Sequence, residues 1–356
     1  MTPISNEDWD DILLDIKDQK AVLLIGPELM QIEGKPLNRH LRDSLHQRNP
    51  NDIAYYYERD GFFLFSSSKS KVRVGRQISR LYRDVMPDEA ILQRIVQIPF
   101  HLIMSINPDT FLSEAFYRHG VKHRFHHFQY RQRDNGNDKM DMPTMALPLI
   151  YNLFGSKDQD DSLVLDYDDM YKMLQSALGE PGLPIKLRGK LREARTYIFL
   201  GFQFDKWYSQ LLLKLLKDDS EQDKLISINN PLEDIDTHQF IIQQFDIKFM
   251  GDQFDFFGEL YKRCDTENIL RGISDDTLCA EAVAILKCVA IGEIDNALEA
   301  LHNAARNKDW ENEVIHLRAR FTRLEDDKHK TDSRDYRTEL AKILDSIIEL
   351  TKNVCP

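Results

Sequence analysis

The fold is decided by the stretch Pro148-Leu-Ile-Tyr-Asn-Leu-Phe-Gly-Ser156, which is followed by Ser162-Leu-Val-Leu-Asp-Tyr-Asp168. It consists of a short apolar run, a Gly-Ser turn, an acidic loop and a second apolar run that enters a helix. An uninterrupted apolar run of this length is typical of a strand that is buried on both faces of a parallel sheet. The turn at Gly155 then lies at the carboxyl end of the strand, where open parallel sheets bind their ligands.

Similar apolar runs recur along the first two thirds of the chain and alternate with helical patterns. We expect strands at 21–25, 101–105, 149–153, 196–200, 224–228 and 247–250. We expect helices at about 6–19, 76–97, 109–119, 167–178, 206–217 and 253–263. Alternation of this kind requires crossover connections and hence a mostly parallel sheet with helices on both faces. The sequence therefore predicts an α/β, Rossmann-like domain over residues 1–262.

After a linker at 263–280, the pattern changes to helix alone. Apolar residues at helical spacing predict four segments, at 282–291, from 293 onward, at 311–329 and at 334–352. Residues 281–356 are therefore expected to form a small all-α domain.

Composition and charge exclude several classes of function. The net charge of −12 argues against a nucleic-acid partner, because binding to phosphates needs clustered Lys and Arg. The basic residues between 186 and 195 are more typical of a solvated helix face than of a binding patch. No apolar leader or membrane-length run is present, so we expect a cytoplasmic protein with no membrane association. The four cysteines lack a Cys-x-x-Cys pair, which predicts neither a structural zinc site nor a disulfide framework.

Four strand ends carry residues suited to a ligand site. They are Gly26-Pro27-Glu28, Ser105 to Asp109 with Asn107 at its centre, Phe154-Gly155-Ser156, and Gly201-Phe202. Glycine lets a backbone approach a phosphate closely, and an Asn amide can both donate and accept hydrogen bonds. Each end taken alone is also typical of an ordinary turn or helix cap, and for Phe202 core packing is favoured over stacking on adenine.

In their order and spacing, these elements resemble those of bacterial sirtuin-like (silent-information-regulator-type) domains. The resemblance covers about residues 15–262 and includes Ser162-Leu-Val-Leu-x-x-x-Asp169 and Phe-Leu-Gly201-Phe-x-x-Asp-Lys-Trp207. It implies NAD, as substrate or ligand, at the strand ends and no metal. It further implies that Gly26 approaches the pyrophosphate, Asn107 positions the attacking water or ribose, Asp109 supports that loop and Gly201 lines the adenosine side.

The chain departs from the family pattern at the position that carries the chemistry. The family has a catalytic His before the glycine that corresponds to Gly155, whereas this chain has Phe154. A phenyl ring cannot accept a proton, and loss of a general base typically costs about 10²–10⁴ in rate. The first turn also departs, because Glu28 would repel a pyrophosphate.

Some tyrosine and histidine side chains are candidate substitutes for the missing base or candidate metal ligands. Tyr151, His126 and His127 are candidate bases, although a His pair among aromatic residues is more often structural. His123, His126 and His127 could place two imidazoles on one helical face, but no carboxylate or thiolate pattern completes a metal site.

The C-terminal helices resemble the small effector-associated domains of bacterial conflict proteins. The residues that carry this resemblance are Ala290-Ile-Gly292-Glu293, Ala297-Leu298, Arg320-Phe-Thr-Arg-Leu-Glu325 and Asp335-Tyr-Arg-x-Glu-Leu340. The resemblance implies pairing with a protein partner, such as an NTPase or protease that carries a matching domain. Two other structures explain the same pattern. One is a helical cap on the sheet domain, and the other is a dimerisation hairpin, which would make the protein a homo-oligomer.

Two hypotheses follow. In the first, the protein is an antiphage or conflict-system component that binds NAD or a related nucleotide and, as an NAD glycohydrolase, cleaves the nicotinamide–ribose bond when a partner assembles it. In the second, it is a catalytically inactive scaffold or nucleotide sensor. Deacetylation is a distant third, because the chain lacks the Cys-x-x-Cys zinc module common in deacetylating sirtuins.

Overall fold

The structure is a computed structural model that describes residues 5–32, 35–83, 85, 88–132, 140–179, 182–217, 224–228, 234–249, 253–273, 278–290, 292–327 and 333–355. The chain divides into two compact units. The first comprises residues 1–112 and 123–272, and the second comprises 113–122 and 273–356.

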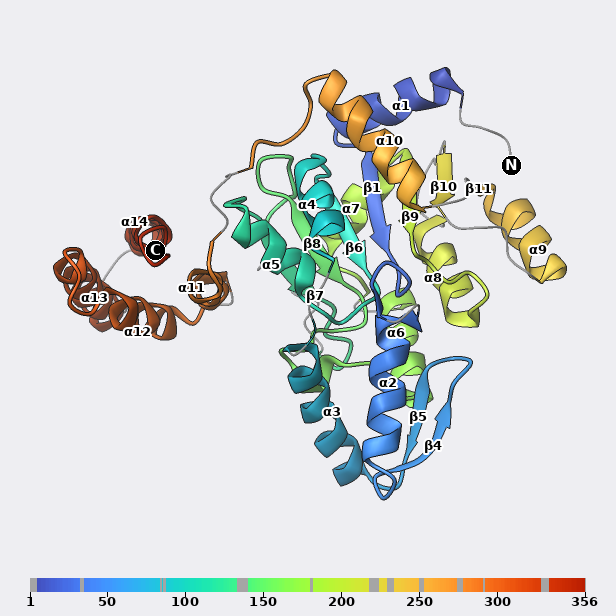
Figure 1. Cartoon of the computed structure of the whole chain (residues 1–356), viewed down its shortest axis with the longest axis horizontal. Coiled ribbons are helices and arrows are strands. Elements are labelled where there is room, and N and C mark those ends of the chain that lie inside the picture. The colour runs from blue at the N-terminus through green and yellow to red at the C-terminus, as the bar shows by residue number, and fades with distance from the viewer. Residues whose placement is uncertain are drawn as a thin grey trace. The chain divides into compact units, whose positions relative to one another are not determined.

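The first unit is built around a parallel sheet with the strand order β11-β10-β9-β1-β6-β8-β7 (Figure 1). The strands are β1 Ala21–Ile25, β6 Leu102–Ser105, β7 Arg124–His127, β8 Leu149–Asn152, β9 Thr196–Leu200, β10 Lys224–Ile228 and β11 Ile247–Phe249. Every neighbouring pair runs parallel. The α/β, Rossmann-like prediction is therefore confirmed, and all six predicted strands are present to within one residue at each end.

Helices connect these strands. They are α1 Asn6–Lys17, α2 Leu37–Arg48, α3 Ser68–Arg83, α4 Glu89–Gln97, α5 Phe111–Arg118, α6 Tyr167–Leu178, α7 Ile185–Glu193, α8 Trp207–Lys217, α9 Ile235–Phe245 and α10 Gln253–Thr266. The single helix expected at 76–97 is wrong, because α3 and α4 are separate. The Asp88 carboxylate accepts hydrogen bonds from the backbone N–H groups of Ala90 and Ile91, which begins α4 as a new helix.

The core on one face of the sheet combines alternate strand residues with α6, α7 and α8. Its members in the strands of the sheet are Val22, Leu24, Leu102, Met104, Leu149, Tyr151, Tyr197, Phe199 and Ile247. Alternate residues point to opposite faces of a strand, so Leu23, Ile103 and Ile198, which are also fully buried, serve the other face. Burial on both faces explains why the strands are continuous apolar runs.

A small module lies between β1 and β6 in the sequence, and only the second half of its last helix was predicted. It contains β2 Gln31–Ile32, β3 Lys35–Pro36, α2, the antiparallel hairpin of β4 Ile53–Tyr57 and β5 Phe62–Phe65, and α3. In this module α3 contacts both α2 and β5 (Figure 1). Gly61 has φ of 75°, a left-handed conformation that suits glycine in the hairpin turn.

The second unit contains the expected C-terminal helices. They are α11 Ala280–Ala290, α12 Ile294–Ala305, α13 Glu311–Asp326 and α14 Ser333–Thr351. Buried residues from all four helices share one core. None of the helices in the described part of the chain is long and apolar enough to cross a membrane.

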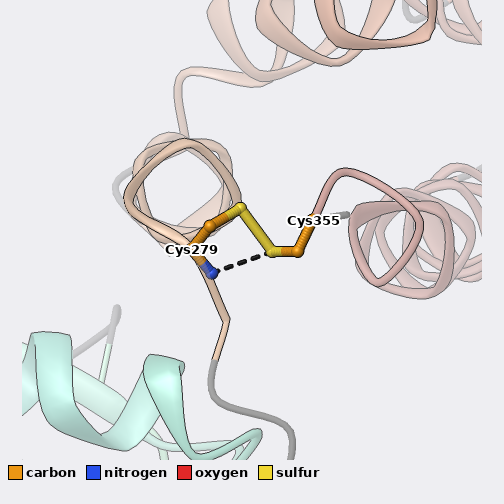
Figure 2. The surroundings of a disulfide bond; sticks show 2 residues. All are labelled: Cys279 and Cys355. Atoms are coloured by element: carbon orange, nitrogen blue, oxygen red, sulfur yellow. Dashed lines mark hydrogen bonds between the residues drawn. A yellow bond between two sulfur atoms is a disulfide. The ribbon is translucent and has the colours of Figure 1, made fainter.

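A disulfide bond joins Cys279 to Cys355, so the expectation of no disulfide was wrong (Figure 2). The backbone N–H of Cys279 also donates a hydrogen bond to the Cys355 sulfur. The two residues are 76 positions apart, and they meet because α11 packs against α14. A pairing that depends on helix packing leaves no local spacing signal in the sequence.

Candidate functional site at the carboxyl edge of the sheet

The four predicted strand ends meet at one edge of the sheet. Gly26, Asn107, Phe154 and Gly201 follow β1, β6, β8 and β9, and these strands are consecutive in the order β9-β1-β6-β8. Because the strands are parallel, their carboxyl ends lie at the same edge. The structure thus brings together residues that are up to 175 positions apart in the sequence.

The turns after β1 and β9 are in close backbone contact. The backbone N–H of Gly26 donates to Leu200 O at 2.9 Å, and that of Glu28 donates to Gly201 O at 3.0 Å. A Cβ atom on Gly26 would lie 2.1 Å from Gly201 O, and one on Gly201, whose φ is 67°, would lie 2.5 Å from Leu29 N. Both glycines are therefore required by this contact, whether or not a ligand approaches them.

This contact has a chemical consequence. Pro27 has no backbone N–H, and the N–H groups of Gly26 and Glu28 are already bonded within the protein. The turn therefore offers an anion fewer donors than a glycine-rich phosphate loop does. The Glu28 side chain lies in the same turn, and Gln203 Nε2 donates to its carboxylate at 3.1 Å. Burial is the main cause that raises the pKa of Glu28 above its usual value, which favours the neutral form.

Asn107 is buried at the end of β6 and makes three hydrogen bonds. Its backbone N–H donates to Ser105 Oγ at 3.0 Å, and its side-chain Nδ2 donates to Gly26 O at 3.0 Å. Its Oδ1 accepts from Asn38 Nδ2 at 2.9 Å. The Tyr82 hydroxyl in turn donates to Asn38 Oδ1. Neither Asn38 nor Tyr82 was predicted as a site residue, because no local motif marks either side chain and they meet Asn107 only in the folded chain.

The loop that contains Asp109 is held by its neighbours. The Asp109 carboxylate accepts from the backbone N–H of Phe111 at 3.1 Å at the start of α5. The Asp109 carbonyl accepts from Asn152 Nδ2 at 2.7 Å, and the Pro108 carbonyl accepts from the Lys157 N–H at 2.7 Å. The loops after β6 and β8 are thus joined by hydrogen bonds.

At the Phe154-Gly155-Ser156 turn, Gly155 has φ of 84°, and a Cβ there would lie 2.1 Å from Ser162 O. The Ser156 N–H donates to Ser162 Oγ at 2.9 Å, so both serines support the turn. The Phe154 ring is half-buried and meets Tyr208 of α8 edge-on, with 5.9 Å between ring centroids. The Phe154 side chain, at the position that the resemblance assigns to the general base, therefore packs as a hydrophobic group.

The candidate substitute bases differ in their surroundings. Tyr151 is fully buried, and burial raises its pKa far above the usual range, so it cannot serve as a base near neutral pH. His127 ends β7 in register with Asn152, and its Nε2 lies 3.1 Å from Gln159 Oε1 in the loop after Ser156. Burial lowers the pKa of His127, which keeps the imidazole neutral at pH 7.

The expectation that two of these histidines share a helical face is wrong. His126 and His127 are adjacent in strand β7, so their side chains point to opposite faces. Burial is also the main cause that lowers the pKa of His126.

The ring of Phe202 lies in the core, in edge contact with Phe199 and close to Phe204. It is 1% exposed, so its side chain supports the fold of this edge.

An ion-pair cluster centred on the buried Asp169 lies at the start of α6. Lys71 Nζ of α3 lies 2.6 Å from both Asp166 and Asp169, and Arg131 lies 2.5 Å from Asp169. Burial acts to raise the pKa of Asp169, but its contacts with Lys71 and Arg131 lower it on balance. The carboxylates of Asp166, Asp168 and Asp169 lie close enough to share a cation, but Lys71 and Arg131 already supply positive charge there. This cluster attaches the small module to α6.

Comparison with known families supports the same division. Residues 101–247 match the model of the SIR2-like domain, and residues 280–354 match Effector-associated domain 11. The first match is shorter than the resemblance seen in the sequence: it includes Asn107, Phe154 and Gly201 but not Gly26. A search among curated proteins found no match.

Proposed function

Because the chain joins a SIR2-like domain to Effector-associated domain 11, we propose that it binds NAD or a related nucleotide and responds to a protein partner. The nucleotide would lie at the carboxyl edge of the sheet, over the turns that carry Gly26, Asn107, Gly155 and Gly201. The partner would bind through the C-terminal helices. The pair of domains suggests a component of a conflict system, and we propose an antiphage role within it.

One observation carries the nucleotide proposal. The buried Asn107 side chain joins the turn after β6 to the turn after β1, and Asn152 and Lys157 join the β6 turn to the turn after β8. Three adjacent strand ends are therefore held in one arrangement. Each amide atom of Asn107 retains capacity for one further hydrogen bond, which suits a ribose hydroxyl or a water.

Of the two forms of the proposal, binding without hydrolysis is the better supported. Phe154 contributes an apolar wall and no proton acceptor, and it packs against Tyr208. The backbone N–H groups of Gly26 and Glu28 are already hydrogen-bonded within the protein, and the Glu28 carboxylate disfavours a phosphate group nearby. A nucleotide-sensing module fits these features with fewer additional requirements than a hydrolase does.

Hydrolysis remains the second candidate, because His127 provides a neutral imidazole beside the loop that follows Phe154. In this form the histidine would act as base from the neighbouring strand. Substitution His127→Gln, which retains hydrogen-bonding capacity, would abolish nicotinamide release by such an enzyme and leave a sensor unaffected.

The proposal is tested by incubating the full chain with NAD, alone and with a protein encoded by a neighbouring gene. Both the nicotinamide released and the NAD retained by the protein in equilibrium dialysis are measured. Retention without release supports the sensor, and release supports the hydrolase. If neither is observed in either condition, the proposal is wrong.

A further inference from the structure

The orientation of the Asn107 side chain is fixed by two partners of opposite character. Gly26 O can only accept a hydrogen bond, so it requires Nδ2 of Asn107 to face it at 3.0 Å. Asn38 presents its Nδ2, which can only donate, to Asn107 Oδ1 at 2.9 Å. A flipped Asn107 amide would place two oxygens together on one side and two NH₂ groups together on the other.

Asn38 is itself oriented by the small module. The Tyr82 hydroxyl of α3 can donate or accept, and here it donates to Asn38 Oδ1, which leaves the Asn38 amide nitrogen to donate to Asn107. The Tyr82 side chain is buried, and its ring packs against Phe111 with 6.0 Å between centroids. The donors therefore run in one direction, from Tyr82 through Asn38 and Asn107 to Gly26.

We propose that Asn38 is a positioning residue for nucleotide binding: held by Tyr82, it bonds Asn107 Oδ1 and, together with the Gly26 carbonyl, keeps the Asn107 amide in place for the ligand. This inference rests on the proposed function for its ligand, but the hydrogen-bonded chain stands on the geometry alone. The small module then has a role at the carboxyl edge of the sheet, because α2 supplies Asn38 and α3 supplies Tyr82, which together hold the Asn107 side chain in place.

The chain contains a matched control for this arrangement. Asn49, directly after α2, and Gln77 of α3 exchange two side-chain hydrogen bonds of 2.9 Å. This pair also joins the α2 region to α3 through an Asn amide, but it makes no hydrogen bond to Asn107. Asn49→Leu therefore reports the general cost of loosening α2 from α3, while Asn38→Leu removes the contact with Asn107 as well.

The experiment measures the dissociation constant of ADP-ribose by calorimetry with the full-length chain and the variants Asn38→Leu, Asn49→Leu, Asn107→Ala and the Asn38→Leu/Asn107→Ala double variant. We expect Asn38→Leu to weaken binding by about tenfold, the scale of one lost hydrogen bond to a ligand-orienting group. Asn49→Leu should stay within about twofold of the natural protein. The double variant should bind no more weakly than Asn107→Ala, because Asn38 acts through Asn107.

Two results would overturn the inference. The first is a dissociation constant for Asn38→Leu equal to that for Asn49→Leu. The second is a loss of affinity in the double variant equal to the product of the losses in Asn38→Leu and Asn107→Ala. If Asn38→Leu fails to fold, Tyr82→Phe removes only the hydroxyl that orients Asn38 and should give a smaller loss in the same direction. Unchanged affinity in a folded Tyr82→Phe protein would then contradict the inference.

Failure of the proposed function can be told apart from failure of this inference. If the natural protein binds neither ADP-ribose nor NAD, the proposed function is wrong, and the hydrogen-bonded chain is then tested by the same double-variant cycle in urea unfolding. Non-additive losses of stability for Asn38→Leu and Asn107→Ala would retain the positioning role of Asn38, whereas additive losses would overturn it.

Discussion

The ring of Phe154 meets that of Tyr208 edge-on, with 5.9 Å between their centroids, and Phe154 stands at the position that the sequence resemblance assigns to a catalytic His. Tyr208 is buried in the core that α8 shares with the sheet. Phe154 is therefore part of the packing between the turn after β8 and α8. The contact explains how the turn keeps its conformation without the polar side chain that the family pattern requires.

Replacement of Phe154 by His should create NAD hydrolysis if only the base is missing. We expect Phe154→His to release nicotinamide about 10²–10⁴ times faster than the natural protein, with the rate rising as the imidazole loses its proton near pH 6.5. Nicotinamide is measured chromatographically. Phe154→Leu is the control, because it loosens the same packing without adding a proton acceptor. Equal rates for the His and Leu variants would show that more than the base is missing.

Glu28 should weaken nucleotide binding through its charge. Burial raises the pKa of Glu28, so its charged fraction grows as the pH increases through that raised value. ADP-ribose affinity should therefore fall with increasing pH, and Glu28→Gln should bind several-fold more tightly at pH 7 with a flatter pH profile. Calorimetry at several pH values measures both effects. The exposed Glu299→Gln makes the same charge change in the second unit and should have no effect. Parallel profiles for Glu28→Gln and the natural protein would contradict this assignment.

His101 should make the fold sensitive to acid. Burial is the main cause that lowers the pKa of His101 to about 4, compared with about 6.5 in the unfolded chain. The unfolded chain therefore binds a proton first, so the contribution of His101 to stability is complete above pH 6.5 and is lost as the pH falls toward 4. The loss approaches roughly 3 kcal/mol.

Urea unfolding at pH 7 and at lower pH measures this loss. His101→Gln removes the titrating group, so the free energy of unfolding of the variant should fall less steeply between pH 6.5 and 4. His126 and His127 have pKa values lowered in the same direction and remain in the variant, so part of the slope should persist. An identical slope in the two proteins would show that His101 does not contribute.

The disulfide should stabilise the second unit. It closes a loop of 76 residues between the start of α11 and the end of the chain, and a link of this kind typically contributes about 2–4 kcal/mol. Reduction or Cys355→Ser should therefore lower the free energy of unfolding. Cys288 is a free cysteine, so Cys288→Ser is the control and should not show this loss.

Alkylation under denaturing conditions tests the pairing itself. Two thiols, Cys264 and Cys288, should react before reduction and all four cysteines after it. Four reactive thiols in the unreduced protein would show that the bond is absent.

The sheet was predictable because its strands are buried on both faces. Val22, Leu102 and Tyr197 occupy one face and their neighbours in the sequence occupy the other, so each strand appears as an unbroken apolar run. The order of glycines and Asn107 at the strand ends then located the candidate edge. Those features depend on local sequence, which is why they could be recognised.

Most of the small module could not be predicted, for the opposite reason. Helix α2 buries only Leu37, Leu41 and Leu45, a narrow stripe in an otherwise polar segment. Its Asn38 acquires a role only through a partner 69 positions away. The same applies to the disulfide, whose halves meet through helix packing, and to Phe154, whose contact with Tyr208 depends on the fold.

Binding of an adenine nucleotide through Asn107, at the carboxyl edge of the sheet, is tested by a calorimetric titration of the full-length chain with ADP-ribose, beside Asn107→Ala. We expect saturable binding at one site by the natural protein and affinity at least about tenfold weaker in the variant. No heat of binding with ADP-ribose or NAD up to about 1 mM, or equal affinity in the two proteins, would contradict it.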